Sequence, residues 1–189
     1  IQQYKLEEED FRGNRFQDHP KNLKGNNDLL SIVQPQIIKE IHTKYLNSGS
    51  NIIETNTFNA TSISQKDYDL SEISDEINKK SAEIGREAIA EFKKNKPEAS
   101  VYLAGAIGPT NTTASMSPDV NDPGKRNIYY DELRRAYYHQ AKSLAEGGVD
   151  LFLIETIFDT LNAKAAIHAV KDLNDNLGTD YPTMLSVTI

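Results

Sequence analysis

Cysteine is absent from the 189-residue sequence, and this absence excludes several kinds of chemistry at once. A chain without thiols forms no disulfide, offers no cysteine nucleophile and builds no thiolate metal site of its own. Histidine is scarce as well. The four histidines show neither the HxH nor the HExxH spacing of a histidine metal site: His19, His42, His139 and His168. We therefore expect no metal ligands within this sequence.

Long apolar runs and an excess of positive charge are also missing. No stretch approaches the roughly 18 apolar residues of a membrane span. Asp and Glu outnumber Lys and Arg by 28 to 21, so the formal net charge is −7 and nucleic acid is disfavoured as a partner. The first residues lack the basic and apolar regions of a secretory signal. These features predict a cytoplasmic protein that binds neither membrane nor nucleic acid.

Helix and strand patterns alternate along the chain. Apolar spacing and capping residues predict four helices, one from Gln34-Pro35 to Gly49, one capped by Ser71 and ending before Pro97, one over about 130–146, and one from Asp159 or Thr160 to Gly178. The apolar face of the first helix is expected to consist of Ile37, Ile38, Ile41 and Tyr45. Short apolar runs predict four strands, at 51–55, 101–107, 149–154 and after Pro182.

The apolar strands are continuous rather than alternating, which indicates burial on both faces, as in a parallel sheet covered by helices. Four strands are too few for a complete eight-stranded barrel of about 250 residues. A barrel fragment and an open doubly wound sheet both remain possible, although no GxGxxG or GxxxxGK motif supports nucleotide binding.

The two ends of the sequence also bear on the domain organisation. The order starts on a helix, and it stops on the apolar run 184–189, whose last residue is Ile189. A bare apolar strand is an unusual end for a domain, because its unpaired edge invites association. We therefore expect one domain over 1–189, truncated at both ends. The alternative is an edge strand that closes a small sheet.

Polar residues follow the strands where a ligand site would lie, at the carboxyl ends. Glu54 and Glu155 occupy equivalent positions and could together bind an ammonium group, or each could accept hydrogen bonds from a neighbouring loop. Asn56 and Thr57 offer neutral donors and acceptors, or else cap the turn. Gly108 is expected to let the backbone turn sharply and expose amides that meet a carboxylate.

The same segments resemble the homocysteine S-methyltransferase family, and in particular its cobalamin-dependent branch. The resemblance runs in order through nearly the whole chain, in the segments DFRG (10–13), LKGNNDL (23–29), IIETNTFN (52–59), GPTN (108–111), SPDVNDP (117–123) and IETIFDTLNAKAA (154–166). It implies an α/β fold, an eight-stranded (β/α) barrel of which this chain covers about strands 2 to 5.

The resemblance also implies a function, methyl transfer to the zinc-activated thiolate of homocysteine to give methionine. Methylcobalamin would be the donor and methyltetrahydrofolate the ultimate methyl source, held by cobalamin and folate domains of the same polypeptide. Glu155 would hold the homocysteine amino group. Asn56, Thr57 and Gly108 would line the pocket, and Glu54 is a weaker correspondence.

The three zinc cysteines of the family have no counterpart in this sequence, and the resemblance implies that they lie beyond Ile189. The family's opening Asp-Gly-Gly-Met-Gly-Thr-Met run is missing as well. We therefore expect that these 189 residues alone neither hold zinc or cobalamin nor methylate homocysteine.

A single-barrel methyltransferase that uses S-methylmethionine or betaine remains open, and so does a non-catalytic binding barrel. A barrel aldolase or sugar-phosphate enzyme is disfavoured, because no Schiff-base lysine or phosphate loop lies near the strand ends.

Overall fold

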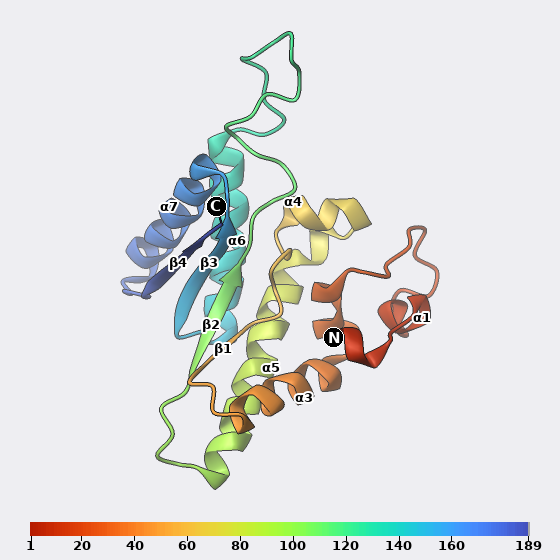
Figure 1. The fold of residues 1–189 in the computed structure, drawn as a ribbon, viewed down its shortest axis with the longest axis vertical. Coiled ribbons are helices and arrows are strands. Elements are labelled where there is room, and N and C mark those ends of the chain that lie inside the picture. The colour runs from red at the N-terminus through yellow and green to blue at the C-terminus, as the bar shows by residue number, and fades with distance from the viewer. Residues whose placement is uncertain (189) are drawn as a thin grey trace.

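The computed structural model describes residues 1–188 and contains one four-stranded sheet (Figure 1). The strands are β1 (Ile52–Glu54), β2 (Tyr102–Ile107), β3 (Leu151–Ile157) and β4 (Thr183–Val187). They are neighbours in chain order, and each adjacent pair is parallel. The predicted α/β class and the partial barrel are therefore confirmed.

Ile189 lies outside the described residues. The apolar run predicted to continue to this residue is found as β4 only as far as Val187. The expectations that the domain is cut at Ile189, and that the family's zinc cysteines lie beyond it, therefore stay predictions.

Four long helices connect or precede the strands, namely α3 (Pro35–Asn47), α5 (Ser74–Asn95), α6 (Tyr130–Gly147) and α7 (Thr160–Leu177). Shorter elements are α1 (Glu8–Arg12), α2 (Leu30–Val33), α4 (Ser62–Gln65) and the 3-10 turns Gln2–Tyr4, Asn27–Leu29, Lys66–Tyr68 and Ser71–Ile73. The predicted helices are present. However, Ser71 does not cap α5, because its hydroxyl donates to the carbonyl of Ser62 while a 3-10 turn precedes the helix. No helix within residues 1–188 combines the length and apolar character needed to span a bilayer.

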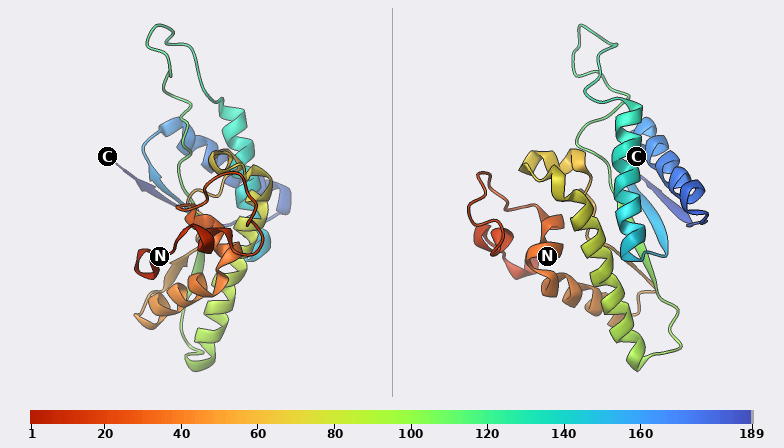
Figure 2. Two further views of the ribbon diagram at one scale, coloured as in Figure 1. Left: turned by 90° about the vertical axis from the view of Figure 1, so that its right-hand side faces the viewer. Right: turned by 180° about the vertical axis from the view of Figure 1, so that it is seen from behind.

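Helices α5, α6 and α7 lie along one face of the sheet (Figures 1 and 2). The strand residues on this covered face are fully buried, with Leu103, Phe152 and Ile154 all 0% exposed. Close approach of helix and strand depends on Gly85 of α5, because a Cβ there would lie 2.6 Å from Leu103 Cδ1. Exclusion of water from this layer is the main source of the fold's stability.

The opposite face of the sheet carries no helix within the described residues. Ile52 is 43% exposed, Tyr102 is 49% exposed, and Met184 is 45% exposed. The prediction that every strand is buried on both faces is therefore wrong for β1 and β4, whose residues are mostly exposed. In β1 the reason is geometric, because alternate side chains point to opposite faces and only one face is covered. β4 lies at the edge of the sheet and is exposed at all five residues.

The buried face of α3 also differs from the sequence prediction. Tyr45 is 61% exposed, and the buried residues of this helix are Ile38, His42 and Leu46. These three are four residues apart and therefore lie on one side of the helix. The sequence pattern failed here because a histidine supplies part of the apolar face.

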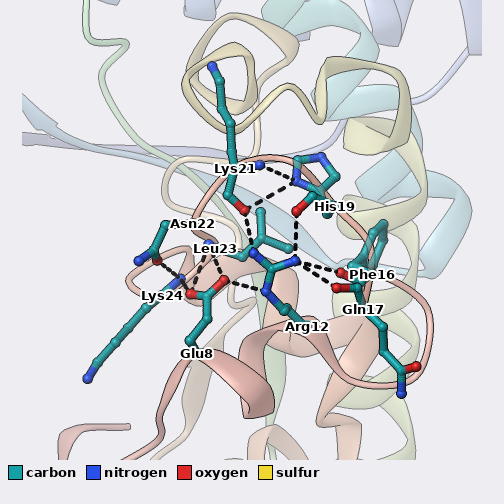
Figure 3. A network of polar contacts seen from close by, with 9 residues as sticks. All are labelled: Glu8, Arg12, Phe16, Gln17, His19, Lys21, Asn22, Leu23 and Lys24. Carbon is teal, nitrogen blue, oxygen red and sulfur yellow. Dashed lines mark hydrogen bonds and ion pairs between the residues drawn. The ribbon is translucent and has the colours of Figure 1, made fainter.

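The segment before α2 is an irregular loop in which the Arg12–Glu8 ion pair makes most of the hydrogen bonds to the backbone (Figure 3). The Arg12 guanidinium contacts Glu8 at 2.7 Å and donates to the backbone carbonyls of residues 16, 17, 19 and 21. The Glu8 carboxylate in turn accepts from the N–H groups of Leu23 and Lys24. The pair thus organises the chain that leads to the turn at 25–28.

Candidate functional site

The carboxyl ends of the four strands meet at one rim of the sheet, where three loops converge. These are the loop after β1, the long loop 108–129 after β2 and the short connection from β3 to α7. The long loop extends well beyond the ends of the strands (Figure 1). Ligand sites of parallel sheets lie at this rim.

Glu54 and Glu155 both lie on the open face. Glu54 is paired in register with Ala104, and Ala104 with Leu151, which lies four residues before Glu155 in the same strand. The prediction that the two glutamates occupy equivalent positions is therefore wrong, because the register places Glu54 level with Leu151. Neither carboxylate forms an ion pair or a hydrogen bond with any group of residues 1–188. Burial, together with the negative charge of Glu54, raises the pKa of Glu155. A half-buried carboxylate beside a like charge is stabilised by an added cation.

Gly108 follows β2 at the level of Glu155, because Ile107 is paired in register with Ile154. A Cβ at Gly108 would lie 2.3 Å from the carbonyl oxygen of Phe58. The need for glycine therefore comes from close packing against the neighbouring loop, whereas we expected a sharp turn. The Tyr137 hydroxyl donates to the Gly108 carbonyl at 3.3 Å, and burial raises the pKa of Tyr137 to about 12. That hydroxyl consequently stays protonated and remains a donor.

Asn56 lies at the rim, but its side chain forms hydrogen bonds with neighbouring segments of the chain. Its Nδ2 donates to the carbonyl of Asn27 at 2.7 Å and to Ser31 Oγ at 3.2 Å. Its backbone N–H donates to Ser81 Oγ. The structure thus brings Asn56 to the predicted place, where it joins the turn at residue 27 to the end of β1.

Thr57 lies beneath the rim and is 0% exposed. Its hydroxyl lies 2.7 Å from that of Thr55 and donates to the carbonyl of Ala106, while its own carbonyl accepts from Gln140 Nε2. In this structure the side chain braces β1 against β2. The sequence could not show this, because a threonine at a strand end has the same local pattern whether it faces the ligand or the interior.

With this geometry in view, comparison with known proteins decides the family. The family model for homocysteine S-methyltransferase matches residues 1–189. The chain belongs to this family.

Solved structures similar to this homocysteine S-methyltransferase chain include two forms of the homocysteine methyltransferase MmuM from Escherichia coli. The metallated form has a TM-score of 0.67 at 21% identity, and the match covers 90% of this chain and 58% of that one. The oxidized form has a TM-score of 0.69 at 20% identity, and the match covers 90% of this chain and 57% of that one. At this identity the likeness shows the fold. The chain spans less than two thirds of the length of either structure.

Metal ligands of the kind implied by the resemblance are not supplied by the described residues. No group of three His, Asp or Glu side chains within residues 1–188 is arranged to hold a metal ion. The sequence also contains no thiol up to its last residue, Ile189. The residues present therefore do not fit a zinc site.

Sequence reasoning assigned no role of its own to Asp28, which lies at the same rim. Asp28 is buried, and its Oδ1 accepts from the N–H of Asn59 at 2.9 Å. Burial raises its pKa to about 6. It lines a cavity of about 410 Å³ together with Tyr68, Asn111 and Phe158. The GNND run contains this residue, but only the tertiary structure brings it to the ends of β1 and β2.

Thr156, directly after Glu155, is also unusual, because its φ of 56° lies in the left-handed region that β-branched residues rarely adopt. Conformations of this kind cost of order 1–3 kcal/mol and are concentrated at functional sites. The sequence carries no signal for it. The conformation supports assigning the end of β3 to the site.

Proposed function

We propose that this chain forms part of the homocysteine-binding barrel of a cobalamin-dependent methionine synthase. The observation that carries the proposal is Glu155, a half-buried carboxylate on the open face with no cationic partner among residues 1–188. The ordered resemblance across residues 10–166 supports the choice of branch, including the GNND and SPDVNDP runs.

In the proposed reaction, the sulfur of homocysteine accepts a methyl group from methylcobalamin, which is remethylated from methyltetrahydrofolate. The folate and cobalamin domains would belong to the same cytoplasmic polypeptide. Zinc would be held by cysteines that this sequence does not contain, and there it would favour the thiolate form of the substrate. Those cysteines would lie beyond Ile189, so the residues of this sequence are assigned to binding and orientation.

The proposed task of Glu155 is to accept hydrogen bonds from the homocysteine ammonium group. Gly108 directly follows the neighbouring strand β2 at the level of Glu155, and adjacent strands lie about 4.8 Å apart in a typical sheet. The N–H groups of Gly108 and Asn111 have no hydrogen-bond partner within residues 1–188 and could donate to the substrate carboxylate. Glu54 adds negative charge to the ammonium site, whereas Asn56 and Thr57 hold the surrounding backbone.

The test is homocysteine binding by the Glu155→Gln variant of the full-length protein that carries this sequence. Loss of a charged hydrogen bond is worth about 1.5–3 kcal/mol, so we expect a Kd about 10- to 100-fold higher by calorimetry. The exposed Glu98 provides a matched control, and Glu98→Gln should leave the Kd unchanged. An unaltered Kd for Glu155→Gln would remove the role assigned to Glu155.

A single-barrel methyltransferase is the second candidate, because the similar solved structures are described as homocysteine methyltransferases. Such an enzyme would take the methyl group from S-methylmethionine or betaine. Methionine formation with each donor separates the candidates: cobalamin-dependent turnover supports the first, and turnover with a sulfonium or quaternary ammonium donor supports the second. Homocysteine binding without transfer from any donor would indicate a binding barrel.

A further inference from the structure

The first turn of α7 holds the base of the long loop after β2. Asn162 is 1% exposed, and its Oδ1 accepts from the N–H of Ala114 at 3.1 Å. Its Nδ2 donates to Thr110 Oγ1 and to the carbonyl of Thr112, both at 3.0 Å. Both polar atoms of this buried amide therefore form hydrogen bonds with the loop.

Asp159, at the start of the same turn, adds a second connection. Its Oδ1 caps α7 by accepting from the N–H groups of Leu161 and Asn162. Its Oδ2 accepts from the hydroxyl and the N–H of Ser115. Although burial opposes ionisation, these hydrogen bonds leave the pKa of Asp159 lowered, so the carboxylate stays ionised at neutral pH.

The two connections join the segments that carry the proposed substrate contacts. Asp159 follows Glu155 by four residues along the chain, so a short connection joins the end of β3 to the first turn of α7. Thr110 follows Gly108 by two residues and receives the hydrogen bond from Asn162. Pairing of β2 with β3 sets the place of Gly108, whereas the first turn of α7 fixes where the following backbone, residues 110–115, lies relative to Glu155.

We propose that Asn162, supported by Asp159, is a positioning residue for the substrate. It holds residues 110–112, and with them the N–H of Asn111, at a separation from Glu155 that allows one homocysteine to use its carboxylate and its ammonium group at the same time. The proposal rests on the proposed function, because it assigns the two contacts to the two polar groups of homocysteine. Two-point binding of a small ligand is sensitive to displacements of about 1 Å.

The test compares two ligands in the full-length protein. Homocysteine uses both contacts, whereas its decarboxylated analogue, 3-aminopropane-1-thiol, can use only Glu155. In the wild-type protein homocysteine should bind more tightly. In Asn162→Ala this advantage should fall by about tenfold, because the Kd of homocysteine rises and that of the amine does not. If Asn162 has a purely structural role, the Kd of both ligands should rise equally, and that outcome would overturn the proposal.

Two further variants keep the experiment decisive. Thr110→Val preserves shape but removes the acceptor for Asn162, so it should reproduce a smaller loss of the same advantage if Asn162→Ala fails to fold. Asn174→Ala is the matched control, because Asn174 uses its amide on residues 179 and 181 at the other end of α7. It should leave the advantage of homocysteine unchanged, and a loss there would contradict the proposal.

Failure of the proposed function is distinguishable from failure of this inference. If the wild-type protein binds neither ligand, the assignment of the site to homocysteine is wrong. If it binds homocysteine through Glu155 but Thr110→Val and Asn162→Ala change both ligands alike, only the positioning role is wrong.

Discussion

The two faces of the sheet are formed by alternating residues of the same strands, yet they have different tasks. In β2, Leu103 is fully buried beneath α5, while its neighbour Tyr102 is half exposed on the open face. In β3, Ile154 belongs to the buried core, while Glu155 is a carboxylate without a cationic partner among residues 1–188. One face therefore stabilises the fold, and the other carries the uncovered carboxylate.

The comparison teaches that a charged group is tolerated in this sheet only where helices do not cover it. On the covered face an unpaired carboxylate would lose its hydration without compensation, at a cost of several kcal/mol. On the open face Glu155 keeps part of its hydration, although burial and Glu54 already raise its pKa. The following predictions test this division.

The largest expected effect is on the covered face. Leu103→Ala should lower the free energy of unfolding by about 2–5 kcal/mol, because it removes a buried side chain and leaves a cavity against α5. Urea denaturation monitored by circular dichroism measures the change. A loss below about 1 kcal/mol would show that the helical layer is not tightly packed at this strand.

Asp28 tests whether a carboxylate at the rim is kept from water, as it would be on the covered face. Its pKa of about 6 exceeds the ordinary value of 3.8, so between these pH values the folded protein binds more protons than the unfolded chain. Stability from this group is therefore full below about pH 4 and is lost as the pH rises through 6. The loss is about 3 kcal/mol, from about 1.4 kcal/mol per pKa unit.

The measurement is urea unfolding of wild type and Asp28→Asn at pH 4 and pH 7. Asparagine retains an acceptor for Asn59, so the variant should lose less stability than wild type over this interval. Burial lowers the pKa of His42 to about 4, which gives the opposite trend in the same interval, and the difference between the two proteins removes it. Parallel pH profiles would show that Asp28 is solvated.

A smaller effect concerns the two glutamates of the open face. Binding of an ammonium group requires ionised Glu155, so its raised pKa should make homocysteine affinity decline as the pH falls through the acid range. Glu54→Gln removes the like charge and therefore lowers the pKa of Glu155. The loss of homocysteine affinity between pH 7 and pH 5 should then be about two- to threefold smaller in this variant than in wild type. Calorimetric titration at pH 5 and pH 7 tests this, with Glu98→Gln as control. If Glu54→Gln and wild type respond identically to pH, the two carboxylates do not share one site.

The smallest effect on stability is expected at Tyr102, which directly precedes Leu103 in the sequence. Tyr102→Thr changes an exposed side chain on the open face and should alter the free energy of unfolding by no more than about 0.5 kcal/mol. The same urea experiment applies. A loss comparable to that of Leu103→Ala would mean that another part of the protein covers this face in solution.

Much of the architecture follows from local pattern. The capping residue Asp159 and the glycines Gly148 and Gly178 mark the ends of α6 and α7 as expected. The apolar residues Leu133, Tyr137, Ala141 and Leu144 are all buried, as their helical spacing predicts. Such signals are readable because they depend on contacts within a few residues.

The sequence predicted the site only in part, because its local signals do not report contacts between distant residues. Glu54, Asn56, Gly108 and Glu155 are found at the carboxyl rim because parallel strands place their ends together. The hidden hydroxyl of Thr57 depends on the carbonyl of Ala106, and the role of Asn162 depends on Thr110. These partners are about fifty residues away, and no spacing rule reports them.

The sequence by itself therefore determined the order of helices and strands, the parallel sheet and the acidic residues at its rim, because backbone propensity and apolar periodicity act locally. The tertiary structure alone decided which face of each strand is open, why Gly108 has no room for a side chain, and how α7 holds the loop that follows β2. Those properties depend on which distant atoms occupy the neighbouring space, and close packing fixes that only after the chain has folded.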